Sequence, residues 1–230
     1  MSKRIVIVSG GKLEESVCLP ILEGQKEGYI IGVDRGLEFL YQHQIMPDYI
    51  VGDFDSVKKE VVDYYREETH AGIREYNPVK DASDTEIAIR LAMTLGGTDL
   101  VILGATGGRI DHLWANVQSL AIPFKAGVHA EILDRQNRIF LLGEGETHIK
   151  KSEAYGPYFS VFPLGDEVFG FTIEGAKYPL PDHVLTPYNR LSVRNEIVRS
   201  HVVIRFGAGH VNLMESGARE WAVGVRCMER

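Results

Sequence analysis

The chain has 230 residues, of which 44% are hydrophobic and 25% charged, and these proportions exclude a disordered or fibrous protein. Its formal net charge of -7 disfavours a nucleic-acid-binding surface, which usually carries a basic excess. No apolar run approaches the roughly 18 residues of a membrane span, and the run Ile5–Ser9 is too short for a signal-peptide core. Cys18 and Cys227 have neither metal-ligand nor redox spacing. We therefore expect a soluble cytoplasmic protein that binds neither nucleic acid nor membranes.

Short apolar runs alternate with amphipathic segments in the first part of the chain, as in βα units around a parallel sheet. The predicted strands are Arg4–Ser9, Tyr29–Val33, Tyr49–Val51, Ile73–Tyr76, Leu100–Leu103 and His129–Leu133. The predicted helices are Arg35–Gln44, Val57–Glu68, Thr85–Leu95 and Asp111–Ser119. The fold class is therefore α/β, with an N-terminal parallel-sheet layer domain over residues 1–137.

The pattern changes after Asn137, where short segments rich in β-branched and aromatic residues are separated by Gly, Pro, Asn or Asp. The predicted strands here are Arg138–Leu142, Thr147–Lys150, Tyr158–Phe162, Val168–Ile173, Leu191–Val193 and Val202–Phe206. No long helical period occurs among them. A smaller all-β sandwich or barrel domain is expected over residues 138–230.

Three acidic segments, Gly52–Ser56, Asp81–Asp84 and Gly107–His112, lie where predicted strands or loops give way to helices. Carboxylates brought together repel one another unless a cation neutralises them, and oxygen ligands suit Mg²⁺. The loops at the carboxyl ends of parallel strands line one crevice, where helix N-termini favour anions. The sequence therefore predicts a site for a metal ion and an anionic ligand at this edge.

Asp53 and Asp55 are two residues apart, so in an extended segment both carboxylates project to the same side and can approach one cation. Gly52 allows a close approach of the backbone. The alternative is that one aspartate caps the following helix and the other is solvated. The two further acidic segments at the same edge favour the metal.

Asp81 and Asp84 immediately precede the predicted helix Thr85–Leu95. Capping of that helix explains one of the two aspartates but not both. Lys80 either steadies a phosphate or pairs with Asp81.

The segment from Gly104 to His112 is the most distinctive in the chain. Gly107 and Gly108 allow positive φ and bring N–H groups against a ligand, while Arg109 can bind two phosphate oxygens at once. The alternative is a tight turn with a salt bridge between Arg109 and Asp111. The Gly-Lys-Ser/Thr ending of a Walker loop is absent, which disfavours a P-loop fold.

Taken together, these segments resemble the thiamine pyrophosphokinase family. The resemblance is carried by Val33–Gly36, Pro47–Ser56, Asp81–Glu86 and Gly107–His112 in this order, followed by the β domain. It implies transfer of diphosphate from ATP to the hydroxyl of thiamine, which gives thiamine diphosphate and AMP. It also implies a homodimer with the site between the α/β domain of one subunit and the β domain of the other.

The resemblance also implies a role for individual residues. Mg²⁺ and the triphosphate are expected at Asp53, Asp55 and Asp84, and Arg109 is expected to clamp phosphate. The other nucleotide contacts expected are Asp34, Arg35, Ser56, Lys80, Asp81, Gly107 and Gly108. The thiamine contacts expected are Asp111, His112, Ser192 and Asn195. Asp111 is expected near the thiamine hydroxyl or pyrimidine and is the first candidate for accepting the hydroxyl proton.

The β domain departs from the family pattern. Relatives carry a Ser-Asn pair that meets thiamine, whereas Arg194 stands here directly before Asn195. Some relatives also place a Trp near the following strand, and the segment Gly209–Leu213 has none. These departures motivate one alternative, diphosphate transfer to another heterocyclic alcohol such as a pterin. A second alternative, a non-catalytic nucleotide- or thiamine-binding module, is disfavoured because no motif position expected to carry chemistry is lost.

Overall fold

The computed structural model describes residues 2–75, 82–188 and 190–217. Contacts divide the chain into two compact units, with the boundary between Arg135 and Gln136. We call the first the α/β unit and the second the β unit. Across the described residues, no helix combines the length and apolar character that crossing a membrane requires.

The α/β unit alternates strands and helices. Its strands are β1 (Arg4–Val8), β2 (Tyr29–Val33), β3 (Tyr49–Gly52), β4 (Gly72–Glu75), β5 (Asp99–Leu103) and β6 (His129–Leu133). Its helices are α1 (Glu15–Glu23), α2 (Gly36–Gln42), α3 (Lys59–Glu67), α4 (Asp84–Thr94), α5 (Ile110–Ser119) and α6 (Ala121–Lys125).

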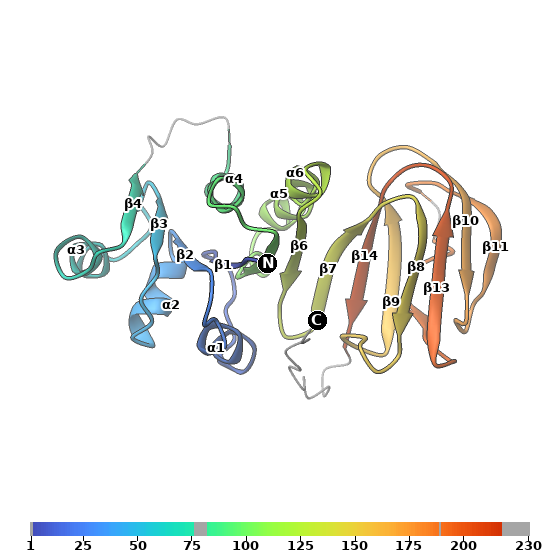
Figure 1. Ribbon diagram of the computed structural model, residues 1–230, viewed down its shortest axis with the longest axis horizontal. Helices are drawn as coiled ribbons and strands as arrows, with labels where there is room; N and C mark the ends of the chain where they lie inside the picture. Colours follow the sequence, from blue (N-terminus) through green and yellow to red (C-terminus); the bar gives the residue numbers. More distant parts are fainter. Residues whose placement is uncertain (1, 76–81, 189, 218–230) are drawn as a thin grey trace. The chain divides into compact units, whose positions relative to one another are not determined.

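All six strands are parallel, in the order β4-β3-β2-β1-β5-β6. The apolar residues of β1 and β5 are buried, as expected for strands covered on both faces. Figure 1 shows α4, α5 and α6 on one face of the sheet and α1 and α2 on the other. The order of the strands reverses beside β1, because β2 and β5 flank it. The crevice at such a reversal is the usual ligand site of an open parallel sheet.

The predicted α/β elements are confirmed to within two residues at each end, except α1 and α6, which the prediction omitted. Tyr76, the last residue of the predicted fourth strand, lies outside the described residues. Each omitted helix contains a proline, Pro20 in α1 and Pro123 in α6. Pro123 is tolerated because it lies in the first turn, where the backbone N–H has no helical partner.

The β unit contains only strands and turns among its described residues. The strands are β7 (Asn137–Leu142), β8 (Gly145–Lys150), β9 (Tyr158–Pro163), β10 (Val168–Glu174), β11 (Leu180–Leu185), β12 (Asn195–Glu196), β13 (His201–Phe206) and β14 (Val211–Ser216).

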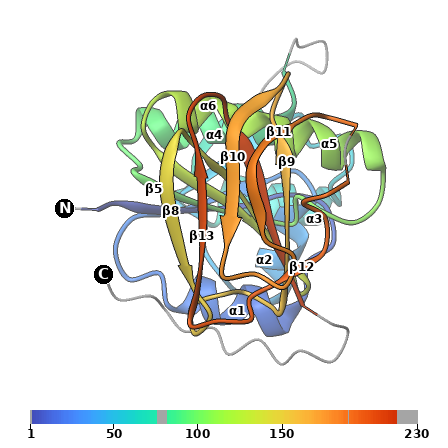
Figure 2. The same cartoon turned by 90° about the vertical axis from the view of Figure 1, so that its right-hand side faces the viewer.

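These strands form two antiparallel arrays, β12-β9-β14-β7 and β11-β10-β13-β8. Figure 2 looks onto the second array. Buried side chains such as Phe159, Phe171 and Phe206 form the core of the unit. Aromatic and β-branched residues alternate with polar ones along these strands, which explains the sandwich. The expected fold class is therefore confirmed.

One predicted strand of the β unit is wrong, and three strands, β11, β12 and β14, were not predicted. Leu191–Val193 forms a turn, because Ser192 is buried and Arg194 adopts a positive φ of 54°. The sequence signal for β11 is weakened by Pro181 and Asp182, and its pairing with β10 shows register shifts. The strand β14 was also missed.

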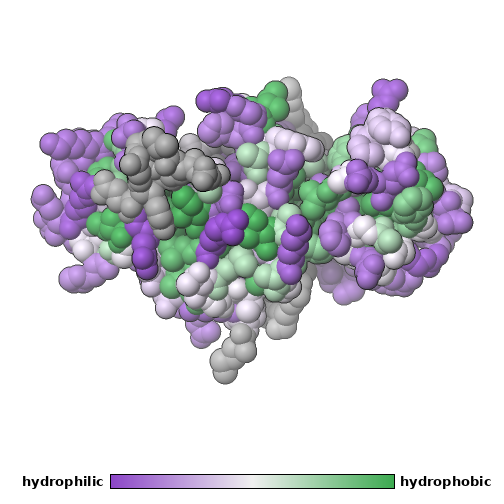
Figure 3. Space-filling model, turned by 90° about the horizontal axis from the view of Figure 1, so that it is seen from above, coloured by the Kyte–Doolittle hydropathy of each residue, from purple (hydrophilic) through white to green (hydrophobic). Residues whose placement is uncertain are grey.

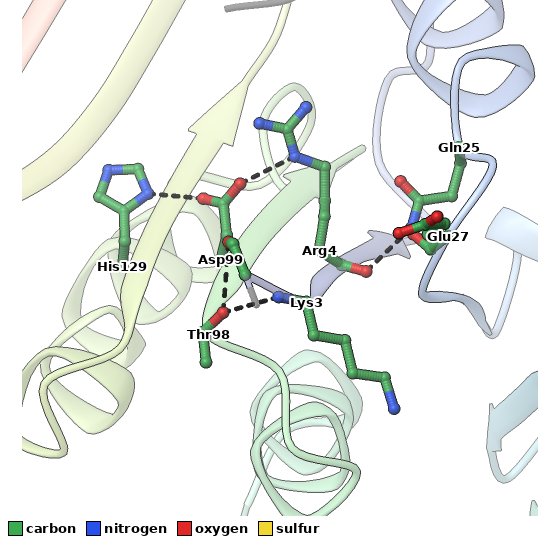
Figure 4. A network of polar contacts seen from close by, with 8 residues as sticks. Lys3, Arg4, Gln25, Glu27, Thr98, Asp99 and His129 are labelled. Carbon is green, nitrogen blue, oxygen red and sulfur yellow. Dashed lines mark hydrogen bonds and ion pairs between the residues drawn. The ribbon is translucent and has the colours of Figure 1, made fainter. Parts of the chain in front are cut away.

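A polar network joins three strand starts at the amino edge of the α/β sheet (Figure 4). Asp99 accepts a 2.8 Å hydrogen bond from Arg4 Nε, and its other oxygen lies 2.9 Å from His129 Nδ1. Burial alone would raise the pKa of Asp99, but the hydrogen bonds from His129 and Arg4 together lower it from 3.8 to about 2. The carboxylate is therefore a stabilising group at the edge opposite the predicted site.

We expect Asp99→Asn to lower the free energy of unfolding by about 2 kcal/mol at pH 7. Because the folded pKa is depressed, this stabilisation is present above about pH 4 and is lost as the pH falls toward about 2. Urea unfolding of both proteins at pH 7, 4 and 3 measures the difference, with Glu23→Gln on α1 as a surface control. A difference that does not shrink at low pH would contradict this assignment.

Candidate functional site

The loops that follow β1 and β5 touch at the reversal of strand order. Gly11 N donates to Gly104 O at 2.8 Å, and Lys12 N donates to Thr106 O at 2.9 Å. A methyl group at Gly107 would lie 2.6 Å from Lys12 Cβ, so the two loops are in close contact. Gly10–Lys12 and the glycine-rich segment are therefore joined at the carboxyl ends of β1 and β5.

The loop after β2 joins the same edge. A Cβ at Gly52 would collide with Asp34 Oδ1, and one at Gly10 would lie 3.1 Å from Arg35 Cβ. Gly52 is thus required for the close approach of the Asp34 side chain to the loop after β3. The segments Val33–Gly36 and Gly52–Ser56 converge, as their parallel strands predict.

The segment Asp53–Asp55 corrects one premise of the sequence interpretation. It is not extended, because Phe54 has a φ of 62° and its side chain is buried. Asp53 Oδ1 accepts a 3.1 Å hydrogen bond from Asp55 N, as in an Asx turn. The two carboxylates are thus held by a turn, and the alternation of side chains along a strand does not apply to them.

Ser83, not an aspartate, caps the predicted acidic helix. Its side chain accepts a hydrogen bond from Glu86 N at 3.2 Å, and Asp84 is the first residue of α4. A buried 2.9 Å hydrogen bond between Thr85 and Ser9 fixes this helix start to the end of β1. Asp84 thus lies near the carboxyl end of β1, while Lys80 and Asp81 lie outside the described residues.

The glycine-rich segment adopts the predicted backbone. Gly107 and Gly108 have φ values of 79° and 93°, which only glycine adopts readily. Asn116 Nδ2 of α5 donates to Ala105 O at 2.9 Å, which anchors the segment to the helix that follows. The turn therefore presents Arg109 at the start of α5.

Arg109 and Asp111 pair with each other in the exposed mouth of the site. Arg109 Nε donates to Asp111 Oδ1 at 3.1 Å, and Nη2 donates to Oδ2. These hydrogen bonds raise the pKa of Arg109 and lower the pKa of Asp111. The carboxylate of Asp111 accepts both hydrogen bonds from the guanidinium of Arg109 in the geometry that a phosphate would take. The salt bridge considered from the sequence is present, and the phosphate clamp requires it to open.

The donors at this edge suit a hard divalent cation, since Asp34, Asp53, Asp55 and Asp84 offer only oxygen. Among the residues that the structure describes, no group of three or more His, Cys, Asp or Glu side chains could by itself hold a metal ion. Mg²⁺ usually binds through one or two carboxylates, several waters and substrate phosphates. The residues present therefore fit a Mg²⁺ ion that arrives with a nucleotide.

Other residues of this edge were not predicted from the sequence. Lys12 Nζ pairs with Glu14 Oε1 at 2.7 Å, and Arg135 Nη1 lies 3.5 Å from Glu14 Oε2. Hydrogen bonding to Lys12 is the main reason that the pKa of Glu14 is lowered. Thr106 Oγ1 also donates to Asp134 at 2.7 Å. The Gly10-Gly11 pair directly after the first strand was the available signal for this loop.

Comparison with known proteins gives the family. The family model "Thiamin pyrophosphokinase, catalytic domain" matches residues 23–132, and "Thiamin pyrophosphokinase, vitamin B1 binding domain" matches residues 146–211. Thiamine pyrophosphokinase of Bacillus subtilis is 32% identical over 217 residues, which are 93% of this chain and 99% of that protein. The chain belongs to the thiamine pyrophosphokinase family.

Solved structures of the family share both units of the fold. The Bacillus subtilis enzyme superposes with a TM-score of 0.82 at 29% identity, covering 94% of this chain and 100% of that one. The Geobacillus thermodenitrificans protein gives 0.80 at 30% identity, with 94% and 99% covered. Yeast thiamin pyrophosphokinase, at 16% identity, has the same fold with a TM-score of 0.78, covering 94% and 86%.

Ser192 and Asn195 lie within the part matched by the vitamin B1-binding domain, and both are buried. Ser192 Oγ donates to Val161 O at 2.6 Å. Asn195 Nδ2 donates to Tyr178 O at 2.7 Å, while its Oδ1 accepts from Tyr178 N at 3.0 Å. These two predicted thiamine contacts therefore brace the turn at 191–194, while Arg194 between them is exposed.

Proposed function

We propose that this protein transfers an intact diphosphate from ATP to the hydroxyl of thiamine, giving thiamine diphosphate and AMP. The observation that carries the proposal is the convergence of the family's acidic and glycine-rich segments at the reversal of strand order. No covalent nucleophile is needed, because phosphoryl transfer is accelerated mainly by positioning and charge neutralisation. A cytoplasmic location, supported by the free thiol of buried Cys18, is part of the same proposal.

The α/β unit would bind and orient the triphosphate. Asp53, Asp55 and Asp84 would hold Mg²⁺, which when bound neutralises phosphate charge. The backbone N–H groups of the exposed residues Gly107 and Gly108 would approach phosphate oxygens. The other nucleotide contacts in the proposal are Asp34, Arg35, Ser56, Lys80 and Asp81.

Arg109 and Asp111 would act in sequence. The thiamine oxygen bonds to the β-phosphorus, the bond from that phosphorus to the α–β bridging oxygen breaks, and AMP leaves with the electron pair. When Arg109 turns to phosphate, Asp111 loses the hydrogen bonds that lower its pKa and becomes a better acceptor for the hydroxyl proton. His112 would lie beside the acceptor.

A homodimer, with each site shared between subunits, belongs to the same proposal. On the face shown in Figure 3 both units carry apolar residues among hydrophilic ones. The large apolar side chains exposed on the β unit are Phe169, Tyr178, Val184, Tyr188, Leu191, Val193 and Val198. Exposed apolar side chains mark an interaction surface where they lie together, and we expect part of this set to lie in the subunit contact. Light scattering after size exclusion should give about twice the 25.7 kDa mass of one chain.

Identification of the products tests the activity. The protein is incubated with ATP, Mg²⁺ and thiamine, and we expect equimolar thiamine diphosphate and AMP. Formation of ADP without AMP would exclude diphosphate transfer. A pterin alcohol assayed in parallel tests the alternative acceptor. This acceptor is tested because Arg194, which is exposed, is a poor neighbour for the cationic thiazolium of thiamine. Binding of thiamine or ATP without any turnover would instead indicate a non-catalytic module.

A further inference from the structure

Arg194 lies on the face of an aromatic ring. Its guanidinium carbon is 5.1 Å from the ring centroid of Tyr158, which is within the range of a cation–π contact. Among the described residues, no carboxylate lies within ion-pair distance of Arg194. The ring of Tyr158 is thus the partner that holds this guanidinium.

The backbone fixes Arg194 in this place. Its φ of 54° is left-handed, and its N–H donates to Ser160 Oγ at 2.9 Å. Residues 195 and 196 pair with 159 and 158, so Arg194 lies diagonally across from Tyr158. Since Phe159 and Val161 point into the core, Tyr158 and Ser160 point to the opposite face of the sheet. Arg194 therefore covers the Tyr158 ring on that outer face.

A second cation and tyrosine lie on the other side of β12 and differ in one respect. Lys177 Nζ is 5.7 Å from the ring centroid of Tyr178, but it also pairs with Glu196 Oε1 at 2.8 Å. Lys177 is held by a carboxylate, whereas Arg194 is held by the ring of Tyr158. A cationic ligand can therefore displace Arg194 from Tyr158 at a lower cost in free energy than it can displace Lys177 from Tyr178.

We propose that the face of Tyr158 that Arg194 covers receives the cationic thiazolium ring of thiamine and that Arg194 is a specificity-determining residue that competes for this face. The proposal builds on the proposed function and on the match of residues 146–211 to a vitamin B1-binding domain. The ring attracts either cation, but two cations cannot share one ring face because they repel each other. The guanidinium must therefore turn away when a cationic substrate binds, and this lowers the affinity for thiamine.

The first test is Arg194→Asn, chosen because Asn tolerates a left-handed backbone. We expect KM for thiamine to fall about three- to tenfold, with kcat changed less than about twofold. Arg194→Lys keeps the charge and should retain a KM near wild type. Arg199→Ser, an exposed arginine in the same unit, serves as a surface control. An unchanged or higher KM in Arg194→Asn would overturn the proposal.

An uncharged thiamine analogue, with carbon in place of the ring nitrogen of the thiazolium, separates charge from shape. In calorimetry without ATP, Arg194→Asn should raise the affinity for this analogue clearly less than it raises the affinity for thiamine. An equal gain for the charged and uncharged ligands would mean that Arg194 acts only as a steric obstacle, and the proposal would fail.

The platform itself is tested by Tyr158→Leu, with Tyr158→Phe as the variant that keeps the ring. Tyr158→Leu should weaken thiamine binding about fivefold or more in the Arg194→Asn background, and Tyr158→Phe should not. Equal binding by the Leu and Phe variants would overturn the proposal. Absence of thiamine-dependent AMP formation in the wild type would instead refute the proposed function, and calorimetry separates the two failures.

Discussion

Replacing Asp55 with Asn is expected to lower kcat at least about 100-fold, which corresponds to about 2.7 kcal/mol of transition-state stabilisation. The side chain of Asp55 is exposed directly after the turn at Phe54, and the backbone N–H of Asp55 donates to Asp53 Oδ1. Asn keeps this backbone hydrogen bond and the shape of the side chain but removes the negative charge that would hold Mg²⁺. The loss should therefore appear in turnover rather than in folding.

Asp84→Asn should lower kcat by a similar factor, since it also removes a carboxylate proposed to hold Mg²⁺. The fold should persist, because Ser83 and not Asp84 caps α4. Steady-state kinetics at several Mg²⁺ concentrations, with melting temperatures, checks both variants. The apparent KM for Mg²⁺ should rise in each. Asp63→Asn on α3 is the matched control, and its kcat should stay within about twofold of wild type. Near-wild-type turnover in Asp55→Asn or Asp84→Asn would refute the metal role of that residue.

Much of the fold follows from local patterns in the sequence. The run Arg4–Val8 is apolar after its first residue and forms a strand covered on both faces, and the fourfold spacing of Ile87, Leu91 and Leu95 marks α4. The misses have the opposite cause. Proline weakened the signals of α1 and α6 although each helix is stabilised by its packing. The segment Leu191–Val193 forms a turn in which only Ser192 is buried, through its hydrogen bond to Val161 O.

The edge of the sheet at which the candidate site lies could be predicted from the sequence, but the positions of its atoms could not. Parallel strands bring their carboxyl ends together, so convergence of Asp34, Gly52 and Gly107 near β1 could be expected. The positive φ of buried Phe54 and the contact of Lys12 with Gly107 depend on residues distant in sequence. The pairing of Arg109 with Asp111 was foreseen only as an alternative.

Arg109→Lys is expected to lower kcat/KM for ATP at least about 30-fold, because an ammonium is a point charge that cannot bind two phosphate oxygens in the plane of a guanidinium. Arg109 already makes two such bonds to Asp111, so the geometry of the fork is present in the structure. Arg90→Lys is the control, since Arg90 is an exposed arginine whose Nε and Nη2 both donate to the single oxygen Oε1 of Glu86 on α4. Its effect should be less than about twofold.

The pH dependence distinguishes a phosphate clamp from a merely structural pair. Hydrogen bonding from Arg109 is the main cause that lowers the pKa of Asp111. Removing the guanidinium in Arg109→Gln takes away that stabilisation of the carboxylate, so the pKa of Asp111 rises toward its ordinary value. If Asp111 accepts the hydroxyl proton, the acidic limb of the kcat/KM profile moves to higher pH in Arg109→Gln. The limb should be absent in Asp111→Asn, where the remaining turnover is low at every pH. A limb that stays in place in Arg109→Gln would assign the proton transfer to another group and leave Arg109 with the phosphate alone.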